Sequence, residues 1–230
     1  MRTKIKYIAV IAMLLNHIAH IFMEPGTVPA ILLTSVGYFT APVMCYFLVE
    51  GFAYTHSRIR YGMRLLLCAF ISQIPFRLVF GPGTLNMMFT LFLGFIALCC
   101  MEHAENSPVS CACVFWLITV SLLCDWPIVA LVLIIMLYVS RTNKERTYSF
   151  IVCGVFVELF TFLNYMEQSG YTILSAFMLS VLCEAAVLVA GYVILHFYEE
   201  KEEKHTSKIN KWFFYLFYPA HLAILYLINL

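Results

Sequence analysis

Charged residues are scarce in this chain of 230 residues, and those that occur are confined to short stretches. Asp, Glu, Lys and Arg make up 12% of the sequence, hydrophobic residues make up 63%, and the mean hydropathy is +0.88. Soluble domains carry about twice that share of charge. The formal net charge is +1, and no basic stripe lies outside the ends of apolar runs, which argues against a nucleic-acid partner.

Three further patterns are missing. We find no sequence repeat, direct or inverted, of the kind that marks solenoids and many transporters. The nine cysteines are an odd number scattered through apolar runs, so they give no disulfide framework and are interpreted as small apolar residues. There is no HExxH motif, and although His17, His20 and Glu24 have helical spacing for a metal, we expect no metal.

Apolar runs fill most of the chain. The sequence predicts an all-α, polytopic membrane helix bundle of about nine transmembrane helices that forms a single domain over residues 1–230. The first run lacks a cleavage site, so we interpret it as a retained helix. The nine runs are Ile5–Met23, Val28–Tyr54, Tyr61–Phe80, Leu85–Met101, Val109–Cys124, Trp126–Val139, Tyr148–Leu163, Tyr171–Tyr198 and Trp212–Ile228.

The basic residues predict the orientation. If the N-terminus is cytoplasmic, thirteen of the fourteen Lys and Arg residues fall at cytoplasmic helix ends and only Arg77 falls outside, as the positive-inside bias requires. Short loops and free cysteines are typical of a bacterial inner membrane protein. The thirteen are Arg2, Lys4, Lys6, Arg58, Arg60, Arg64, Arg141, Lys144, Arg146, Lys201, Lys204, Lys208 and Lys211.

The fifth and sixth runs are short and meet at Asp125-Trp126-Pro127. They have two interpretations: two helices, or one long kinked helix. A single helix would place Arg141, Lys144 and Arg146 outside, against the charge bias, so we predict two helices.

Polar residues interrupt the second half of the first run. Asn16, His17 and His20 lie within about one helical turn, and their cost in lipid favours a catalytic or ligand-binding role over packing alone. Lys6 precedes His17 by eleven residues, so both project from nearly the same face, about 16 Å apart along the axis. One helix face thus offers a cation for phosphates at the mouth and a base deeper inside. The alternative is a lysine that only reaches toward headgroups.

Other runs carry polar residues too. Pro42 is expected to kink or open the second run, which ends at Glu50. Glu158 and Glu184 fall near mid-run, where carboxylates are protonated or paired, and His221 lies mid-run behind Tyr218-Pro219. Arg77, the single outer cation, either binds an anionic group or pairs with Asp125. The polar residues expected at the outer side are Gln73, Arg77, Asn86, Thr90 and Asp125.

Five short motifs, in order along most of the chain, resemble the TraX family, named after the plasmid-encoded F-pilin acetylase. Each is weak alone, and five in order are fairly specific. Three positions differ from the family pattern: Asn16 stands for Asp, Tyr38 for the Arg of many members, and Gln73 for Glu. The motifs are Lys6-Tyr7-Ile8-Ala9 through Asn16-His17, Ala41-Pro42 to Glu50-Gly51-Phe52, Ser72-Gln73-Ile74-Pro75-Phe76, Asn86…Phe89-Thr90-Leu91…Gly94, and Phe217-Tyr218-Pro219-Ala220-His221-Leu222.

The resemblance implies an integral-membrane acyltransferase. It would take acetyl from cytosolic acetyl-CoA, its co-substrate, and deliver it to an amine or hydroxyl of a peptide, such as a pilin-like N-terminus, or of a surface glycan. Related glycan O-acetyltransferases carry a basic residue at a similar distance before a histidine in their first helix. The candidate residues are His17, Asn16 and His221 for catalysis, Lys6, Lys4, Glu50 and Tyr38 for the co-substrate, and His20, Gln73, Arg77, Asn86 and Asp125 for the acceptor.

Two mechanisms fit His17. It would act as a general base toward the acceptor, with Asn86, Tyr218 or His221 donating to the oxyanion, or it would itself be acylated. The sequence does not separate them.

Two other function classes fit the same residues. A proton-coupled transporter of a small polar solute also needs buried His, buried Glu and broken helices, and dependence on acetyl-CoA separates it from an enzyme. An inactive membrane scaffold would be consistent with Asn16 in place of Asp. The sequence decides neither the acceptor nor the oligomeric state.

Overall fold

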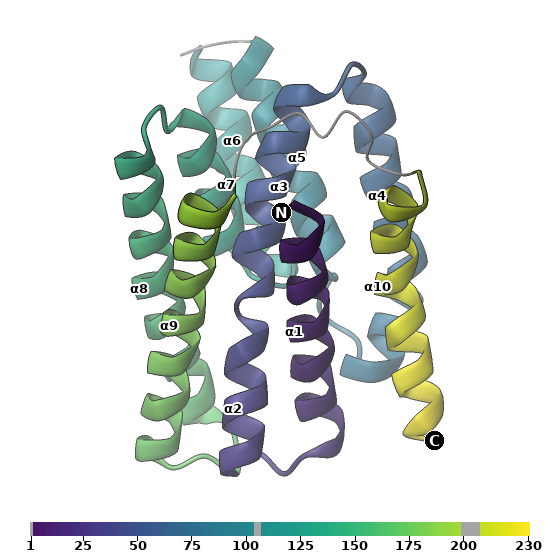
Figure 1. Ribbon diagram of the computed structural model, residues 1–230, viewed down its shortest axis with the longest axis vertical. Helices are drawn as coiled ribbons and strands as arrows, with labels where there is room; N and C mark the ends of the chain where they lie inside the picture. Colours follow the sequence, from purple (N-terminus) through teal and green to yellow (C-terminus); the bar gives the residue numbers. More distant parts are fainter. Residues whose placement is uncertain (1, 104–106, 199–207) are drawn as a thin grey trace.

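The chain is seen here in a computed structural model that describes residues 2–103, 107–198 and 208–230. Within these ranges it forms ten α-helices, one 3-10 helix and no named strand, gathered in one bundle (Figure 1). The all-α prediction is therefore confirmed. The elements are α1 Arg2–Phe22, α2 Val28–Gly37, α3 Thr40–Tyr54, α4 Arg58–Phe80, α5 Met87–His103, α6 Pro108–Val120, η1 Ser121–Leu123, α7 Val129–Val139, α8 Asn143–Glu167, α9 Ile173–Phe197 and α10 Lys208–Ile228.

Length and composition make this a multi-pass membrane protein. Five described segments are long and apolar enough to cross a bilayer, namely Thr3–Phe22, Val28–Tyr54, Arg58–Phe80, Asn143–Glu167 and Ile173–Phe197. Four shorter apolar segments are Met87–His103, Pro108–Leu123, Val129–Val139 and Tyr215–Ile228. The nine segments follow the nine predicted runs in order.

The second predicted run is divided at residues 38–39 into α2 and α3. Pro42 lies in the first turn of α3 and has no N–H to donate to the carbonyl of Tyr38, four residues earlier. The proline therefore opens the helix, as predicted, but the break lies before it rather than at it. The hydroxyl of Thr40 donates to the Ala9 carbonyl at 2.7 Å, which holds the break against α1.

The fifth and sixth runs form separate helices, as predicted. η1 and an irregular turn at residues 124–128 join α6 to α7, and Trp126 and Ile128 in this turn have φ angles of 56° and 61°. The turn is bound to the loop between α4 and α5, because the Leu85 N–H donates to the Leu123 carbonyl at 2.8 Å and the Asp125 N–H donates to the Leu85 carbonyl at 2.7 Å. With 11 residues, α7 spans only about 16 Å.

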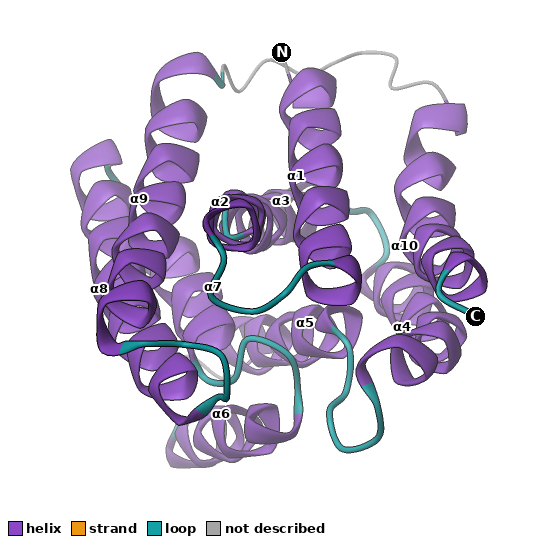
Figure 2. Cartoon of the chain, turned by 90° about the horizontal axis from the view of Figure 1, so that it is seen from below, coloured by secondary structure: helices purple, strands orange, loops and turns teal. Residues whose placement is uncertain are grey.

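The two mid-run glutamates lie on neighbouring helices. α8, which carries Glu158, and α9, which carries Glu184, pack side by side (Figures 1 and 2). A Cβ on Gly154 of α8 would lie 3.1 Å from Cγ of Glu184. The Glu184 side chain therefore lies at the α8–α9 interface, one turn from the position of Glu158.

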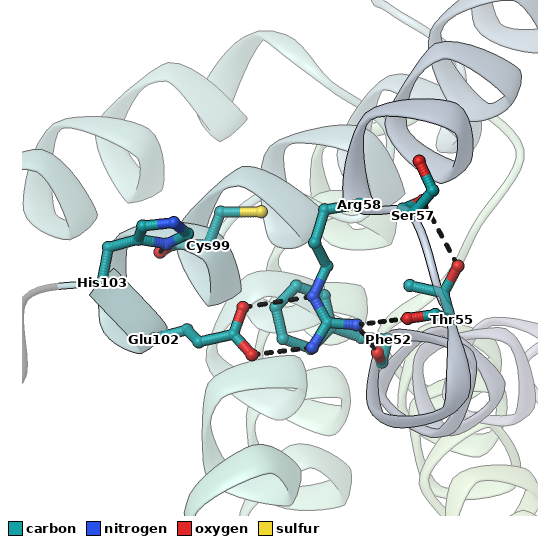
Figure 3. Close-up of polar contacts among 7 residues, drawn as sticks. All are labelled: Phe52, Thr55, Ser57, Arg58, Cys99, Glu102 and His103. Carbon is teal, nitrogen blue, oxygen red and sulfur yellow. Dashed lines mark hydrogen bonds and ion pairs between the residues drawn. The ribbon is translucent and has the colours of Figure 1, made fainter.

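Basic side chains mark one end of the bundle, which we call the basic end. There Arg58 binds both carboxylate oxygens of Glu102 on α5, with Nε–Oε2 at 3.1 Å and Nη2–Oε1 at 2.7 Å (Figure 3). Its Nη1 donates to the carbonyls of Phe52 and Thr55, and its guanidinium carbon lies 3.8 Å from the Phe52 ring centroid. These contacts join the end of α3 to α4 and α5.

Some predicted basic-end residues lie outside the described side chains. They are Arg2, Lys201, Lys204, Lys208 and Lys211.

Replacing Arg58 with Lys is expected to lower the free energy of unfolding by about 1 kcal/mol, because an ammonium cannot form the two parallel bonds or reach both carbonyls. The midpoint of thermal unfolding in detergent measures the effect. Arg60→Lys is the control, since Arg60 is exposed at the same end. An unchanged midpoint for Arg58→Lys would show that the contact adds nothing to stability.

Candidate active site

Two buried histidines from opposite ends of the sequence meet between α1 and α10. His17 Nδ1 lies 2.8 Å from His221 Nε2, and the rings are nearly parallel, with an interplanar angle of 4° and centroids 5.0 Å apart. His17 is 9% exposed and His221 is 4% exposed. The sequence prediction named both residues as catalytic candidates, and the structure brings them together.

A backbone carbonyl decides which nitrogens carry hydrogen. His221 Nδ1 lies 2.8 Å from the Phe217 carbonyl oxygen, which can only accept, so Nδ1 is protonated. In a neutral imidazole Nε2 of His221 then carries the lone pair and accepts a hydrogen bond from Nδ1 of His17. This leaves the lone pair of His17 on Nε2, which makes no hydrogen bond within the described residues. His17 Nε2 is therefore the atom able to take a proton or attack an acyl carbon.

Aromatic rings surround this histidine pair. Phe80 of α4 meets His17 edge-on with centroids 5.3 Å apart, and the Phe217 ring stacks on His221 at 4.9 Å. The Tyr218 ring lies 5.7 Å from His221. His20 also contacts Phe80, at 6.3 Å, but it is exposed. The walls around His17 and His221 are thus largely apolar, which strengthens hydrogen bonds between them.

Pro219 frees a carbonyl in α10, and a thiol donates to it. Proline cannot donate to the Tyr215 carbonyl four residues earlier. Cys68 Sγ on α4 lies 3.5 Å from that oxygen and donates to it. The freed carbonyl thus helps to join α10 to α4.

The residues proposed for the co-substrate divide into two places. Lys6 is half-buried near the basic end with Nζ 4.6 Å from the Phe47 ring centroid, Glu50 is buried and accepts from the Tyr198 hydroxyl, and Lys4 is exposed. Tyr38 lies at the α2–α3 break, twelve residues or about 18 Å of helix from Glu50. The structure therefore does not bring Tyr38 to the same place as Glu50.

The outer polar residues are also divided. Arg77 is exposed and forms no ion pair with Asp125 among the described residues, so the pairing alternative is not what the structure shows. Asp125 instead accepts from the Trp126 N–H at 3.0 Å, and its backbone carbonyl accepts from the Thr90 hydroxyl at 2.6 Å. In the part of the chain that the structure describes, no group of three or more His, Cys, Asp or Glu side chains is placed to hold a metal.

Sequence reasoning did not single out Phe80, the Phe217 carbonyl or Trp126 as parts of a site. Phe80 and Trp126 are apolar residues in or beside apolar runs, which carry no signal of their own. The Phe217 carbonyl is a backbone group, so no residue type marks it in the sequence. Its position four residues before His221 was the signal that could have found it, because a histidine in a helix can bond to the carbonyl four residues earlier.

Comparison with known proteins shows the family of this chain. The model of the TraX protein family matches residues 1–229. The chain belongs to the TraX family. A probable fimbrial assembly protein FimC, serogroup H1, from Dichelobacter nodosus is 30% identical over 236 residues, covering 96% of this chain and 93% of that protein. No solved structure gives a significant match.

Asn16, the neighbour of His17 in the sequence, binds a different helix. Its Nδ2 donates to the Thr34 carbonyl of α2 at 2.7 Å, and α2 approaches so closely at Gly37 that a Cβ there would lie 2.1 Å from Cβ of Asn16. Neighbours on a helix point about 100° apart, so Asn16 faces α2 while His17 faces α10. Asn16 joins two helices rather than touching the imidazole pair.

Gln73 forms one hydrogen-bond network with Asn86. Gln73 Oε1 accepts from the Asn86 N–H at 2.9 Å and from Asn86 Nδ2 at 2.7 Å, while its own Nε2 donates to the Thr84 carbonyl at 2.9 Å. Asn86 Nδ2 also donates to the Ala69 carbonyl, and Oδ1 accepts from the Met88 N–H, both at 2.9 Å. With both amide hydrogens used, Asn86 has none left to stabilise an oxyanion.

Asn86→Ala is expected to destabilise the protein by several kcal/mol, since it leaves buried donors and acceptors on α4 and α5 without partners. The midpoint of thermal unfolding in detergent tests this. Thr84→Ala is the matched control, because the exposed Thr84 contributes only its backbone carbonyl to the network. An Asn86→Ala protein with the wild-type midpoint but lost activity would contradict the structural role and favour an oxyanion donor.

Proposed function

We propose that this TraX-family chain is a membrane acetyltransferase that moves an acetyl group from acetyl-CoA to an amine or hydroxyl of a peptide, such as a pilin-like N-terminus, or of a surface glycan. The observation that carries the proposal is the buried His17–His221 pair, which leaves a lone pair on His17 Nε2. Membership of the TraX family and the fimbrial assembly role in the relative's name support a pilin-type acceptor.

The geometry supports general-base catalysis. The acceptor nitrogen or oxygen forms a bond to the thioester carbonyl carbon, and its proton passes to His17 Nε2. The resulting imidazolium donates from Nδ1 to His221, whose own Nδ1–H donates to the Phe217 carbonyl, so the new charge is shared along the chain. When the carbon–sulfur bond breaks, the CoA thiolate takes the proton back from His17.

The basic end fits a phosphate-bearing donor. Lys6 on α1 lies over the Phe47 ring, and Arg146 on α8 has its guanidinium carbon 6.0 Å from the Tyr46 ring centroid, so the two cations flank α3. Lys6 lies about 16 Å from His17 along α1. Glu50 of α3 accepts a hydrogen bond from the hydroxyl of Tyr198, the residue after α9, and this bond joins α3 to the end of α9. In this proposal the basic end faces the cytoplasm of a bacterium, where acetyl-CoA is made.

The test is transfer of radiolabelled acetyl from acetyl-CoA, in membranes that hold the protein and its fimbrial or pilin substrate. His17→Ala is expected to lower the rate about 10²- to 10⁴-fold, as loss of a general base does. His221→Phe, which keeps a ring but no acceptor for His17 Nδ1, is expected to give a smaller loss because the imidazole loses its fixed tautomer.

His196→Ala is the control, since this histidine is exposed at the end of α9 and its hydrogen bond among the described residues is to the Tyr192 carbonyl of the same helix, at 3.0 Å. Each variant is checked for the wild-type unfolding midpoint. Background incorporation by folded wild type in the presence of the acceptor would reject the acetyltransferase. A transporter would instead move solute without consuming acetyl-CoA.

A further inference from the structure

Phe80, the last residue of α4, contacts His17 and also reaches the surface of the protein. Its ring meets His17 edge-on with centroids 5.3 Å apart, and it lies 6.3 Å from the ring of the exposed His20, about one turn further along α1. Phe76, which is buried, packs behind Phe80 with ring centroids 5.0 Å apart. Phe80 is 38% exposed, whereas His17 is 9% exposed. The Phe80 ring is therefore the part of the His17 surroundings that faces the outside of the bundle.

Phe80 lies at a level of the membrane that water can reach. α4 begins with Arg58 at the basic end and runs beside α10 to the opposite end of the bundle (Figure 1). Its 23 residues extend about 34 Å, which is enough to cross a hydrocarbon core of about 30 Å. The last residue of α4 thus lies near the membrane surface opposite the basic end, where water and lipid headgroups meet the protein.

The chain that follows Phe80 is uncrowded. α4 ends there because Gly81 has a φ angle of 84°, and the Gly81 N–H donates to the Arg77 carbonyl at 3.0 Å. Gly83 has a φ angle of 126°, and both Pro82 and Gly83 are exposed. Within the described part of the chain, a Cβ added to Gly81 or Gly83 would meet no atom within 4 Å. A molecule can therefore approach the outer side of Phe80, and the ring has room to turn outward.

A base beside this surface needs protection from water. The lone pair on His17 Nε2, which activates the acceptor in the proposed function, can equally activate water. The water oxygen then bonds to the thioester carbonyl carbon while its proton passes to His17 Nε2. When the carbon–sulfur bond breaks, the CoA thiolate takes that proton, and the products are acetic acid and CoA. Acyl transfer at this site thus requires a barrier between bulk water and His17.

We propose that Phe80 is this barrier: its ring keeps water from His17 Nε2, and the acyl acceptor displaces the ring as it enters from the end of the bundle opposite the basic end. The inference rests on the proposed function, because it assigns the two substrates to opposite sides of His17. The acyl donor comes from the basic end, and the acceptor comes past the end of α4. The role of Phe80 is the same for an amine and for a hydroxyl acceptor.

The first test measures the accessibility of His17 without turnover. Diethyl pyrocarbonate carbethoxylates neutral imidazole nitrogens, and mass spectrometry of peptides gives the rate for each histidine of the purified protein in detergent. Phe80→Ala is expected to raise the rate at His17 about tenfold, relative to the exposed His196 of the same sample, because the barrier is removed. Phe80→Trp, which keeps an aromatic ring at this position, should react like the wild type.

Phe70→Ala is the matched control. Phe70 is a 60% exposed ring on the same helix, and it packs on Phe89 with centroids 5.2 Å apart. This variant should leave the rate at His17 unchanged. His221 is an internal control, since both of its ring nitrogens are in hydrogen bonds and it should stay unreactive in Phe80→Ala. If Phe80→Ala does not fold, Phe80→Leu replaces it, with a smaller expected increase because part of the apolar bulk remains.

Three results would overturn the role of Phe80. They are a wild-type rate at His17 in the folded Phe80 variant, an equal rise in Phe70→Ala, and a rise at His221 as large as that at His17. The last two would show that the bundle has loosened rather than that one barrier has been removed.

Turnover separates this inference from the proposed function. With acetyl-CoA and an acceptor, Phe80→Ala is expected to release about tenfold more acetate per acetyl group transferred, with KM for acetyl-CoA unchanged. If the folded wild type transfers no acetyl but His17 becomes more reactive in Phe80→Ala, the shielding stands and the acetyltransferase is rejected. If the wild type transfers acetyl and Phe80→Ala changes neither His17 reactivity nor acetate release, the acetyltransferase stands and the shielding is rejected.

Discussion

Inside a bilayer no water is available to hydrogen-bond a backbone group, so every point where a helix of this chain breaks must satisfy its own donors and acceptors. The break before Pro42 is held by the Thr40 hydroxyl of α3, which donates to the Ala9 carbonyl of α1. The Tyr215 carbonyl freed by Pro219 accepts from Cys68. At the α6–α7 turn, Thr90, Leu85 and Ser121 supply the missing partners. These polar contacts cross between helices, and they therefore fix the relative positions of α1, α4, α5 and α10 as firmly as apolar packing does.

The same breaks bring polar groups of the candidate site into the interior of the bundle. Because α2 stops at residues 38–39, the Tyr38 ring reaches Trp126 in the middle of the bundle instead of continuing a regular helix. Pro219 lies between Tyr218 and His221 in α10, and His221 there meets both the Tyr218 ring and His17. A strictly regular bundle would bury only apolar faces here. The irregular positions are where polar chemistry is possible, as in transport proteins whose discontinuous helices form binding sites.

The sequence predicted the parts of this structure that depend on local pattern. The apolar runs predicted the helices in their order along the chain, and the charge bias predicted that α6 and α7 are separate helices. Contacts between distant residues had no such signal. His17 and His221 are 204 residues apart, and nothing in either motif shows that their rings meet. Asn86 was a reasonable oxyanion donor until the structure showed that Gln73 and Ala69 use both its amide hydrogens.

The Phe217 carbonyl changes how the Asn16 position is interpreted. An acidic residue beside a catalytic histidine serves by orienting the ring and favouring its protonated form, and Asn16 does neither, because it bonds to α2. In this chain orientation comes from His221, which is itself fixed by a carbonyl that cannot donate. A chain of two imidazoles and a carbonyl carries no formal negative charge, so it leaves His17 neutral in the resting state and able to accept a proton. Asn at position 16 is therefore compatible with an active general base, and it does not favour an inactive scaffold.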